Sequence, residues 1–268
     1  DQQPNCITSW SLNDVNKDCI PDREQASIGI DAEPSLASLT DALLNWLPSR
    51  VNGSPAPMYL IFADHGNPDT FYLGDETFSA SELNNWLNSL ENDYLTDLSL
   101  LEPRTVIYGA CYSGSFLPKL SKASSLTDAG RIIITSSAAD EVSYKGPKAL
   151  ANDIRSGEYF LESLFSHLKS GLSLAEAFKL ATNETEIYTR AGGDSTNSLN
   201  AYFDTAVQHP LLDDSGDGIG SNLLSDASED GLKAANLYLG AGLSYDTNAI
   251  LNPAVVIEVA PIQILHVS

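Results

Sequence analysis

Two apolar stretches of the chain lead into side chains that can do covalent chemistry. The run Tyr59–Ala63 is followed closely by His65 and Gly66, and the run Thr105–Ala110 is followed directly by Cys111. A free thiol, with a pKa of about 8.5, is only a few per cent thiolate at neutral pH, so it needs a nearby base to act as a nucleophile. The pattern therefore predicts that Cys111 attacks a carbonyl carbon after His65 accepts its proton.

The acyl-enzyme formed in this way would be hydrolysed by water, and its tetrahedral oxyanion requires two hydrogen-bond donors. We expect the backbone N–H groups of Cys111 and Gly66 to supply them, because glycine lets a backbone donor approach a substrate closely. Asp64 precedes the histidine and is expected to orient this loop rather than the imidazole. A lone cysteine is more often a small buried hydrophobe, and a lone histidine a structural residue, so the prediction depends on the pair.

Hydrophobic periodicity predicts the elements that must position these residues. Three buried strands are expected at 58–63, 105–110 and 131–135. Helices are expected at 35–47, 79–90, 159–169 and 173–188, and Ser79 and Ser173 each open a capping box. Residues 71–78 are expected to form a hairpin or loop. The alternation indicates an α/β fold with a mostly parallel sheet covered on both faces, in which chemistry collects beyond the carboxyl ends of the strands.

Length and charge exclude several classes of function. The chain has 268 residues, with 14 Lys and Arg against 36 Asp and Glu, and its net charge is −22 at pH 7. This acidity opposes binding to nucleic acid or to an anionic membrane surface. No apolar run approaches the roughly 18 residues that a membrane span needs. We therefore expect no nucleic-acid partner and no membrane span.

The cysteines favour an extracytoplasmic setting. Cys6 and Cys19 are close enough in sequence to pair, which leaves Cys111 as a single thiol. One disulfide and one free thiol fit an oxidising compartment, such as the periplasm or the cell surface. The sequence opens with Asp1 rather than Met and shows no signal peptide, which we interpret as processing of a precursor or excision from a longer chain.

Asp64-His65-Gly66 and Ala110-Cys111-Tyr112-Ser113-Gly114 resemble the paired motifs of the legumain-like cysteine peptidases, a family with the caspase-type fold. Residues 135–144 resemble the family's Thr-Ala-Ala…Ser-Tyr segment, which borders the substrate cleft. Residues 209–218 resemble a segment of the bacterial secreted members. The similarity implies a three-layer caspase-like α/β fold and a secreted, bacterial-type cysteine endopeptidase that acts on peptide or protein substrates.

The same resemblance implies a set of residues that line the substrate cleft, namely Asp64, Gly109, Ser136, Ser137, Ser143 and Tyr144. Asp140 and Glu141, in the loop after the third strand, could recognise a basic or amide side chain of the substrate. Animal and plant members usually have Glu at the positions of Gly109 and Tyr112, and their preference for cutting after Asn depends partly on the first of these acids. The cleavage preference of this chain is therefore left open between Asn, Asp and basic residues.

The family domain normally begins with an apolar strand and a helix before the region that matches Cys6. Neither is visible here, so we expect a central sheet that lacks the usual first strand. The chain is then a fragment, or one part of a cleaved or split protein whose N-terminal segment or further domains are partners. We divide it into an Asp/Asn-rich leading segment at 1–33, a caspase-like peptidase domain at 34–245, and a linker or the start of a following β domain at 246–268.

Two Asp-rich loops predict structural calcium, whereas catalysis itself is expected to need no cofactor. Calcium loops place oxygen ligands at alternate positions. The first loop offers Asp14, Asn16, Asp18 and Asp22. The second offers Asp213, Ser215 and Asp217. Both lack the Glu that completes such a loop, and a polar turn is the alternative interpretation.

Two other functions are compatible with the sequence. A catalytically silent caspase-fold module that binds a partner would explain the absent first strand, although the retained His65 and Cys111 argue against it. A transpeptidase or ligase would use the same two residues, because an amine can capture the acyl-enzyme instead of water. The sequence does not separate hydrolysis from ligation.

Overall fold

A four-stranded sheet lies at the centre of the structure, a computed structural model that describes residues 32, 34–147, 157–191, 207–224 and 229–239. Its strands, in spatial order, are β1 (Met58–Ala63), β5 (Arg104–Gly109), β6 (Arg131–Thr135) and β7 (Leu211–Asp213). The first three run parallel and β7 is antiparallel to β6. The three predicted strands are confirmed, with β1 at one edge of the described sheet, whereas β7 was not predicted from its short, Asp-rich sequence.

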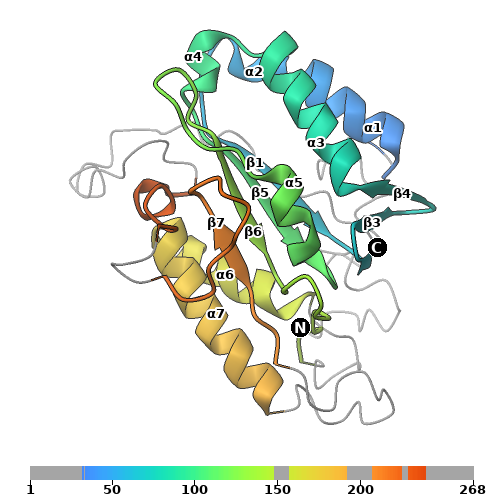
Figure 1. Ribbon diagram of the computed structural model, residues 1–268, viewed down its shortest axis with the longest axis vertical. Helices are drawn as coiled ribbons and strands as arrows, with labels where there is room; N and C mark the ends of the chain where they lie inside the picture. The colour runs from blue at the N-terminus through green and yellow to red at the C-terminus, as the bar shows by residue number, and fades with distance from the viewer. Residues whose placement is uncertain (1–31, 33, 148–156, 192–206, 225–228, 240–268) are drawn as a thin grey trace, which may run out of the picture.

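Helices cover both faces of this sheet (Figure 1). One face carries α1 (Leu36–Asp41), η3 (Ala42–Trp46), α2 (Leu47–Val51), α3 (Ala80–Ser89), η4 (Leu90–Tyr94), η5 (Ser113–Phe116) and α5 (Leu117–Leu120). The other face carries α6 (Tyr159–Lys169), α7 (Leu174–Arg190) and the short η8 (Ala234–Asn236). A further short helix, α4 (Asp97–Leu100), precedes β5. Within the described residues, no helix is long and apolar enough to cross a membrane.

Alternate side chains of the strands enter two separate hydrophobic clusters. Phe62 and Val106 pack with the helices around α3, while Ile61 and Ile107 pack with α6 and α7. Successive residues of a strand point to opposite faces of the sheet. Both faces are therefore buried, which explains why the strands are nearly continuous apolar runs in the sequence. The result is the predicted three-layer α/β fold with a mostly parallel central sheet.

A small antiparallel sheet follows β1 and leads into α3. It consists of β2 (Gly66–Asn67), β3 (Thr70–Leu73) and β4 (Glu76–Ser79). β3 and β4 form the expected hairpin, which turns at Gly74 with a φ of +62° that favours glycine. Both predicted capping boxes are present, at Ser79 for α3 and at Ser173 for α7. These caps fix where the two helices begin.

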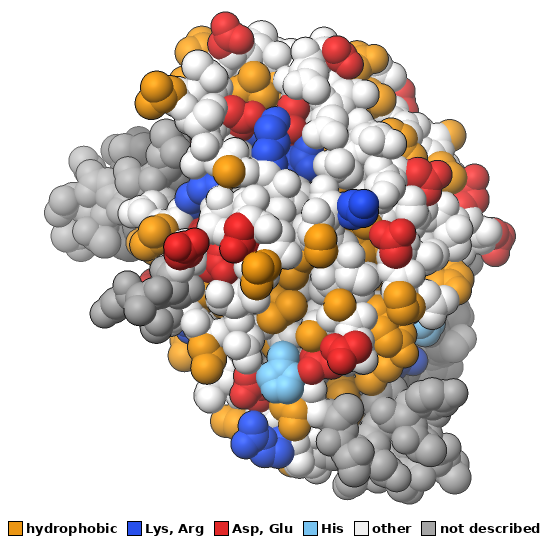
Figure 2. Space-filling view, viewed as in Figure 1, with side chains coloured by type: hydrophobic (Ala, Val, Ile, Leu, Met, Phe, Trp, Pro, Cys, Tyr) orange, Lys and Arg blue, Asp and Glu red, His pale blue; other side chains and the backbone are white. Residues whose placement is uncertain are grey.

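The acidity of the chain is visible on its surface and also shapes its interior. On the face shown in Figure 2, Asp and Glu side chains are spread widely and basic side chains gather in a few places.

Three basic residues, Arg104, Lys122 and Arg131, neutralise buried or half-buried acids at the amino ends of β5 and β6. Glu91 accepts hydrogen bonds from Arg104 Nε at 3.1 Å, Arg131 Nε at 2.8 Å and Lys122 Nζ at 2.7 Å.

Glu91, Arg104 and Arg131 are almost fully buried, so this cluster is highly sensitive to the loss of one charge. Burial raises the pKa of Glu91, but the hydrogen bonds and charges of Arg131, Lys122 and Arg104 outweigh it and hold the pKa below its usual value. Asp128 completes the cluster by pairing with Arg104 and Lys122. The cluster therefore connects η4, β5 and β6 at the end of the sheet opposite Cys111.

We expect Glu91→Gln to lower the free energy of unfolding by about 3–5 kcal/mol, because two buried guanidinium groups lose their counter-charge. Glu186→Gln is the matched control, since Glu186 pairs with the exposed Arg190 in an i,i+4 geometry and such pairs contribute about 0.5 kcal/mol or less. Urea denaturation measures the free energy of unfolding of both variants and of the wild type. Equal, small effects of the two substitutions would contradict the role given to the buried cluster.

Candidate active site

The pairing register of β1 and β5 brings the two sequence motifs together at the carboxyl end of the sheet. Ala63 pairs with Gly109 where these parallel strands end. His65 and Cys111 each lie two residues further along the chain, so the same offset of 46 residues relates both pairs. The histidine and the cysteine therefore follow neighbouring strands at equivalent positions.

Gly66 determines how closely the two segments approach. A Cβ added at Gly66 would overlap the carbonyl oxygen of Cys111. Gly66 also begins β2, where it pairs with Phe71, and the N–H of Tyr72 donates to the carbonyl of His65 at 3.1 Å. Backbone packing thus holds the histidine loop against the turn that contains the cysteine.

Asp64 stabilises the backbone of the histidine loop. Its Oδ1 accepts the N–H of His65 at 2.6 Å, and its own N–H donates to the carbonyl of Gly109 at 3.3 Å. His65 is exposed, and its imidazole makes no hydrogen bond within the described parts of the chain. The arrangement fits the expectation that Asp64 orients the loop and leaves the imidazole free to reach a substrate or the thiol.

Cys111 is half-buried and is a free thiol. The backbone N–H of Ser143 donates to its Sγ at 3.4 Å, and the Ser143 hydroxyl lies 3.8 Å from the same atom. A donor at this position stabilises negative charge on sulfur. The backbone N–H of Cys111 makes no hydrogen bond to any described residue and remains available as a donor.

Cys111 is followed by a strained turn. Tyr112 has a φ of +59°, in the left-handed region that bulky residues rarely occupy. The turn is fixed by the Tyr112 N–H, which donates to the Glu141 carbonyl at 2.7 Å, and by the Ser113 N–H, which donates to the Ala110 carbonyl at 3.3 Å. Such strain costs on the order of 1–3 kcal/mol and recurs where a nucleophile is exposed at the end of a strand.

Ser136 and Ser137 do not line a cleft, contrary to the expectation from family resemblance. Both are fully buried. Ser136 Oγ accepts the N–H of Ala110 at 3.1 Å, and Ser137 Oγ donates to the Ala110 carbonyl at 3.1 Å and lies 3.2 Å from Ser113 Oγ. These two serines bind the backbone of Ala110 and the Ser113 hydroxyl, on either side of Cys111, so their role is to position the cysteine turn.

Tyr144 is also buried rather than presented to a substrate. Its N–H donates to Oε1 of Gln208 at 2.8 Å. The Gln208 side chain in turn donates to the Ser136 carbonyl at 2.6 Å and to Glu158 Oε1 at 2.8 Å. Sequence reasoning missed Gln208 and Glu158, because nothing in their local pattern signals a buried polar network.

Glu158 caps α6 through a hydrogen bond from the Leu161 N–H to its carboxylate at 2.8 Å. Desolvation raises the pKa of Glu158 to about 7, although hydrogen bonds from Leu161 and Gln208 oppose the rise. The network behind the cysteine turn thus contains a carboxyl group that changes charge near neutral pH.

Gly109 contacts α6 rather than open space. A Cβ at this position would overlap the side chain of Leu161. A glutamate, as found in the animal and plant relatives, therefore has no room here unless Leu161 moves. The small size of Gly109 therefore serves the packing of α6 onto β5, and its assignment to the substrate cleft stays a prediction from the resemblance.

Glu141 holds the loop that supports the cysteine turn. Its carboxylate accepts the ring Nδ1–H of His209 at 2.5 Å, the backbone N–H of His209 at 2.8 Å and the N–H of Ala138 at 3.1 Å. These bonds occupy the side chain, so Glu141 does not offer a free acid for recognising a basic substrate. We assign His209 a protonated Nδ1, because an ionised carboxylate can only accept a hydrogen bond.

The acidic segment around Asp213 forms a hydrogen-bonded turn. The Asp213 carboxylate accepts the N–H groups of Gly216 at 2.7 Å and Gly218 at 2.9 Å, and also the hydroxyl of Ser121. Asp217 accepts the N–H of Ile219 at 2.7 Å. Backbone donors thus order this turn around the carboxylates of Asp213 and Asp217.

No group of three or more His, Cys, Asp or Glu side chains that could hold a metal occurs in the described part of the chain. The interpretation of Asp213, Ser215 and Asp217 as calcium ligands stays a prediction, beside the polar turn that their hydrogen bonds form. The other candidate ligands, Asp14, Asn16, Asp18 and Asp22, lie outside the described residues, as do Cys6 and Cys19.

A free thiol and an imidazole at the ends of adjacent parallel strands define an α/β protein with the arrangement of a cysteine hydrolase. The model of the peptidase C13 family matches residues 51–214, which include both motifs, and the chain therefore belongs to this family, the legumain family of cysteine peptidases. No curated protein matches the chain. Among solved structures it is similar to caspase-1 from Spodoptera frugiperda, with 12% identity, a TM-score of 0.48 and 67% of each chain covered.

We expect Gly66→Ala to slow the reaction of Cys111 with a peptidyl thiol probe by about 100-fold, because the added methyl group displaces the histidine loop from the cysteine turn. Gly53→Ala is the matched control, since a Cβ at Gly53 meets no atom within 4 Å. Labelling rates and circular dichroism spectra are compared for both variants. A folded Gly66→Ala protein that labels at the wild-type rate would show that the close approach is irrelevant.

Proposed function

We propose that the protein is a cysteine endopeptidase in which Cys111 is the nucleophile and His65 the general base. The observation that supports this best is the β1–β5 register, which places both residues two positions beyond paired strand ends. Gly66, where any Cβ would overlap the Cys111 carbonyl oxygen, permits this close approach. Membership of a cysteine peptidase family agrees with this assignment.

The proposed reaction begins when His65 accepts the proton of the Cys111 thiol. The sulfur attacks the carbonyl carbon of the scissile peptide bond, and the oxyanion is stabilised by the backbone N–H groups of Cys111 and Gly66. The tetrahedral intermediate collapses, and the departing amine takes the proton from His65. Water, activated by His65, then attacks the thioester, which releases the new carboxylate and restores the thiol.

Two positions considered for recognition of a substrate side chain do not offer a free carboxylate. Position 109 is a glycine packed against Leu161, and the Glu141 carboxylate already accepts a hydrogen bond from His209. Ser143 is the one residue of the expected cleft set whose polar groups lie beside Sγ. We propose that the cleavage preference depends on Ser143 and its neighbours and differs from that of relatives with Glu at position 109.

We further propose that the protein acts outside the cytoplasm and that the segment 14–22 binds structural calcium. The spacing of Cys6 and Cys19 supports the first proposal and the alternating oxygen side chains support the second. The catalytic sequence above requires neither a metal nor an organic cofactor.

A peptidyl acyloxymethyl ketone, which alkylates catalytic thiols, tests the proposed function. We expect Cys111→Ala to abolish labelling and His65→Ala to slow it by about 100-fold or more, because the thiolate is no longer generated by a local base. His167→Gln should label like wild type, since His167 contacts Glu184 at the surface of α6 and α7. Labelling that survives in Cys111→Ala, or is unchanged in His65→Ala, would refute the assignment.

A further inference from the structure

The hydroxyl group of Ser115 joins the β2–β3 hairpin, which follows His65, to the turn that follows Cys111. The N–H of Asp69, at the tip of this hairpin, donates to Ser115 Oγ at 2.8 Å. The same Oγ donates to the carbonyl of Tyr112 at 2.7 Å. Ser115 therefore bridges the backbone of the two segments that follow β1 and β5.

Both residues that this hydroxyl contacts have a strained backbone. Among the described residues, Asp69, with a φ of +57°, and Tyr112, with a φ of +59°, are the ones other than glycine whose φ is positive. Such conformations cost on the order of 1–3 kcal/mol and persist only where the surrounding structure holds them. A hydrogen bond from one side chain to each of the two strained residues indicates that the position of one turn is set relative to the other.

Two contacts fix the hairpin against the cysteine turn. At the base of the hairpin, a Cβ at Gly66 would overlap the carbonyl oxygen of Cys111, so the two backbones touch there. At the tip, Asp69 is bonded to Ser115. Because β2 consists of only two residues, few ladder hydrogen bonds resist a rotation of the hairpin about its base. The contact at the tip prevents this rotation.

The hairpin also determines where His65 lies. The N–H of Tyr72, in β3, donates to the carbonyl of His65 at 3.1 Å, so the histidine backbone moves with the hairpin. The imidazole itself makes no hydrogen bond within the described parts of the chain. The backbone therefore decides which atoms the ring can reach.

We propose that Ser115 is a positioning residue for the acylation of Cys111, whose hydroxyl holds the β2–β3 hairpin where His65 can accept the thiol proton. This inference rests on the proposed function, because it gives Ser115 an effect only through His65 and no contact with the substrate. The hydroxyl already donates to Tyr112 and accepts from Asp69, which fits a structural link rather than a second nucleophile.

Alkylation of the full chain by iodoacetamide, followed at Cys111 by peptide mass spectrometry, tests this role. The reagent is small and needs no peptide subsite, so its rate reports the reactivity of the thiol. We expect Ser115→Ala to slow alkylation about tenfold near pH 6.5, because the thiol loses its local base. The difference should shrink towards about pH 9, where an unassisted thiol ionises without help.

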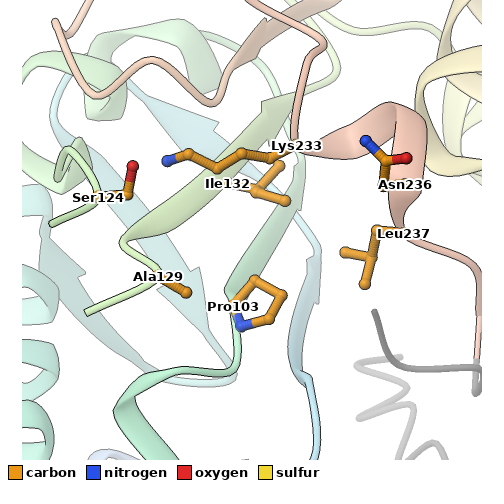
Figure 3. A pocket seen from close by; sticks show the side chains of 7 residues that line it. All are labelled: Pro103, Ser124, Ala129, Ile132, Lys233, Asn236 and Leu237. Atoms are coloured by element: carbon orange, nitrogen blue, oxygen red, sulfur yellow. The ribbon is translucent and has the colours of Figure 1, made fainter. Parts of the chain in front are cut away.

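Three further variants separate the hydroxyl group from the shape of the side chain. Ser115→Thr keeps the hydroxyl and should react at the wild-type rate, whereas Ser115→Val has the shape of threonine and should react like Ser115→Ala. This pair also serves if Ser115→Ala fails to fold. Ser124→Ala is the matched control, because it removes a serine hydroxyl beside the apolar pocket at the amino ends of β5 and β6 (Figure 3). It should react like wild type.

A double-mutant cycle shows whether Ser115 acts through His65. In a His65→Ala background, Ser115→Ala should change the rate by less than about twofold, because the base that it positions is already absent. The acids of these segments, Asp64, Asp69 and Glu141, are the same in every variant, so differences between the pH profiles report the loss of the base.

The outcomes separate this inference from the proposed function. Slow alkylation of His65→Ala together with a wild-type rate and pH profile for Ser115→Ala would overturn the role of Ser115 alone. A tenfold effect of Ser115→Ala that persists in the His65→Ala background, or equal rates for the Thr and Val variants, would also overturn it. Wild-type alkylation of His65→Ala would overturn the proposed function and this inference together.

Discussion

The parallel pairing of β1 with β5 is the constraint on which the rest of the site depends. A shift of one residue between these strands would move His65 away from Cys111 and exchange the faces on which their side chains lie. The register is maintained from both sides, since alternate residues such as Ile61 and Phe62 are buried against different helical layers. At the end of the pair, Gly66 permits a backbone approach to Cys111 that any side chain would prevent.

The two ends of the sheet are stabilised by different physical means. At the amino ends, Glu91 neutralises Arg104 and Arg131 in a buried ionic cluster. At the carboxyl ends, neutral serine hydroxyls hold the backbone of the cysteine turn. Beside these hydroxyls, the carboxylates of Asp64 and Glu141 accept backbone N–H groups of His65 and His209. The ionic cluster, by contrast, joins η4, β5 and β6 through buried charges, which are costly to leave unpaired.

The sequence was most informative where short-range patterns reflect burial. The apolar strands, the capping boxes at Ser79 and Ser173, and the location of His65 and Cys111 beyond neighbouring strand ends were predicted because each leaves a local or motif-level signal. The burial of Ser136 and Ser137 was not predictable, because a serine-rich segment after a strand is equally compatible with an exposed loop. Gln208 and β7 were not predicted for a related reason, because tertiary packing brings their partners from distant parts of the chain.

The central claim is that Cys111 forms a covalent acyl intermediate at the end of β5. Rapid acid quenching of the reaction with an activated peptidyl ester, followed by intact-mass and tandem mass spectrometry, tests it most directly. The account predicts a protein population carrying the acyl group as a thioester on Cys111, whose decay matches the release of the acid product. Turnover without an acylated Cys111, or an acyl group on another residue, would contradict it.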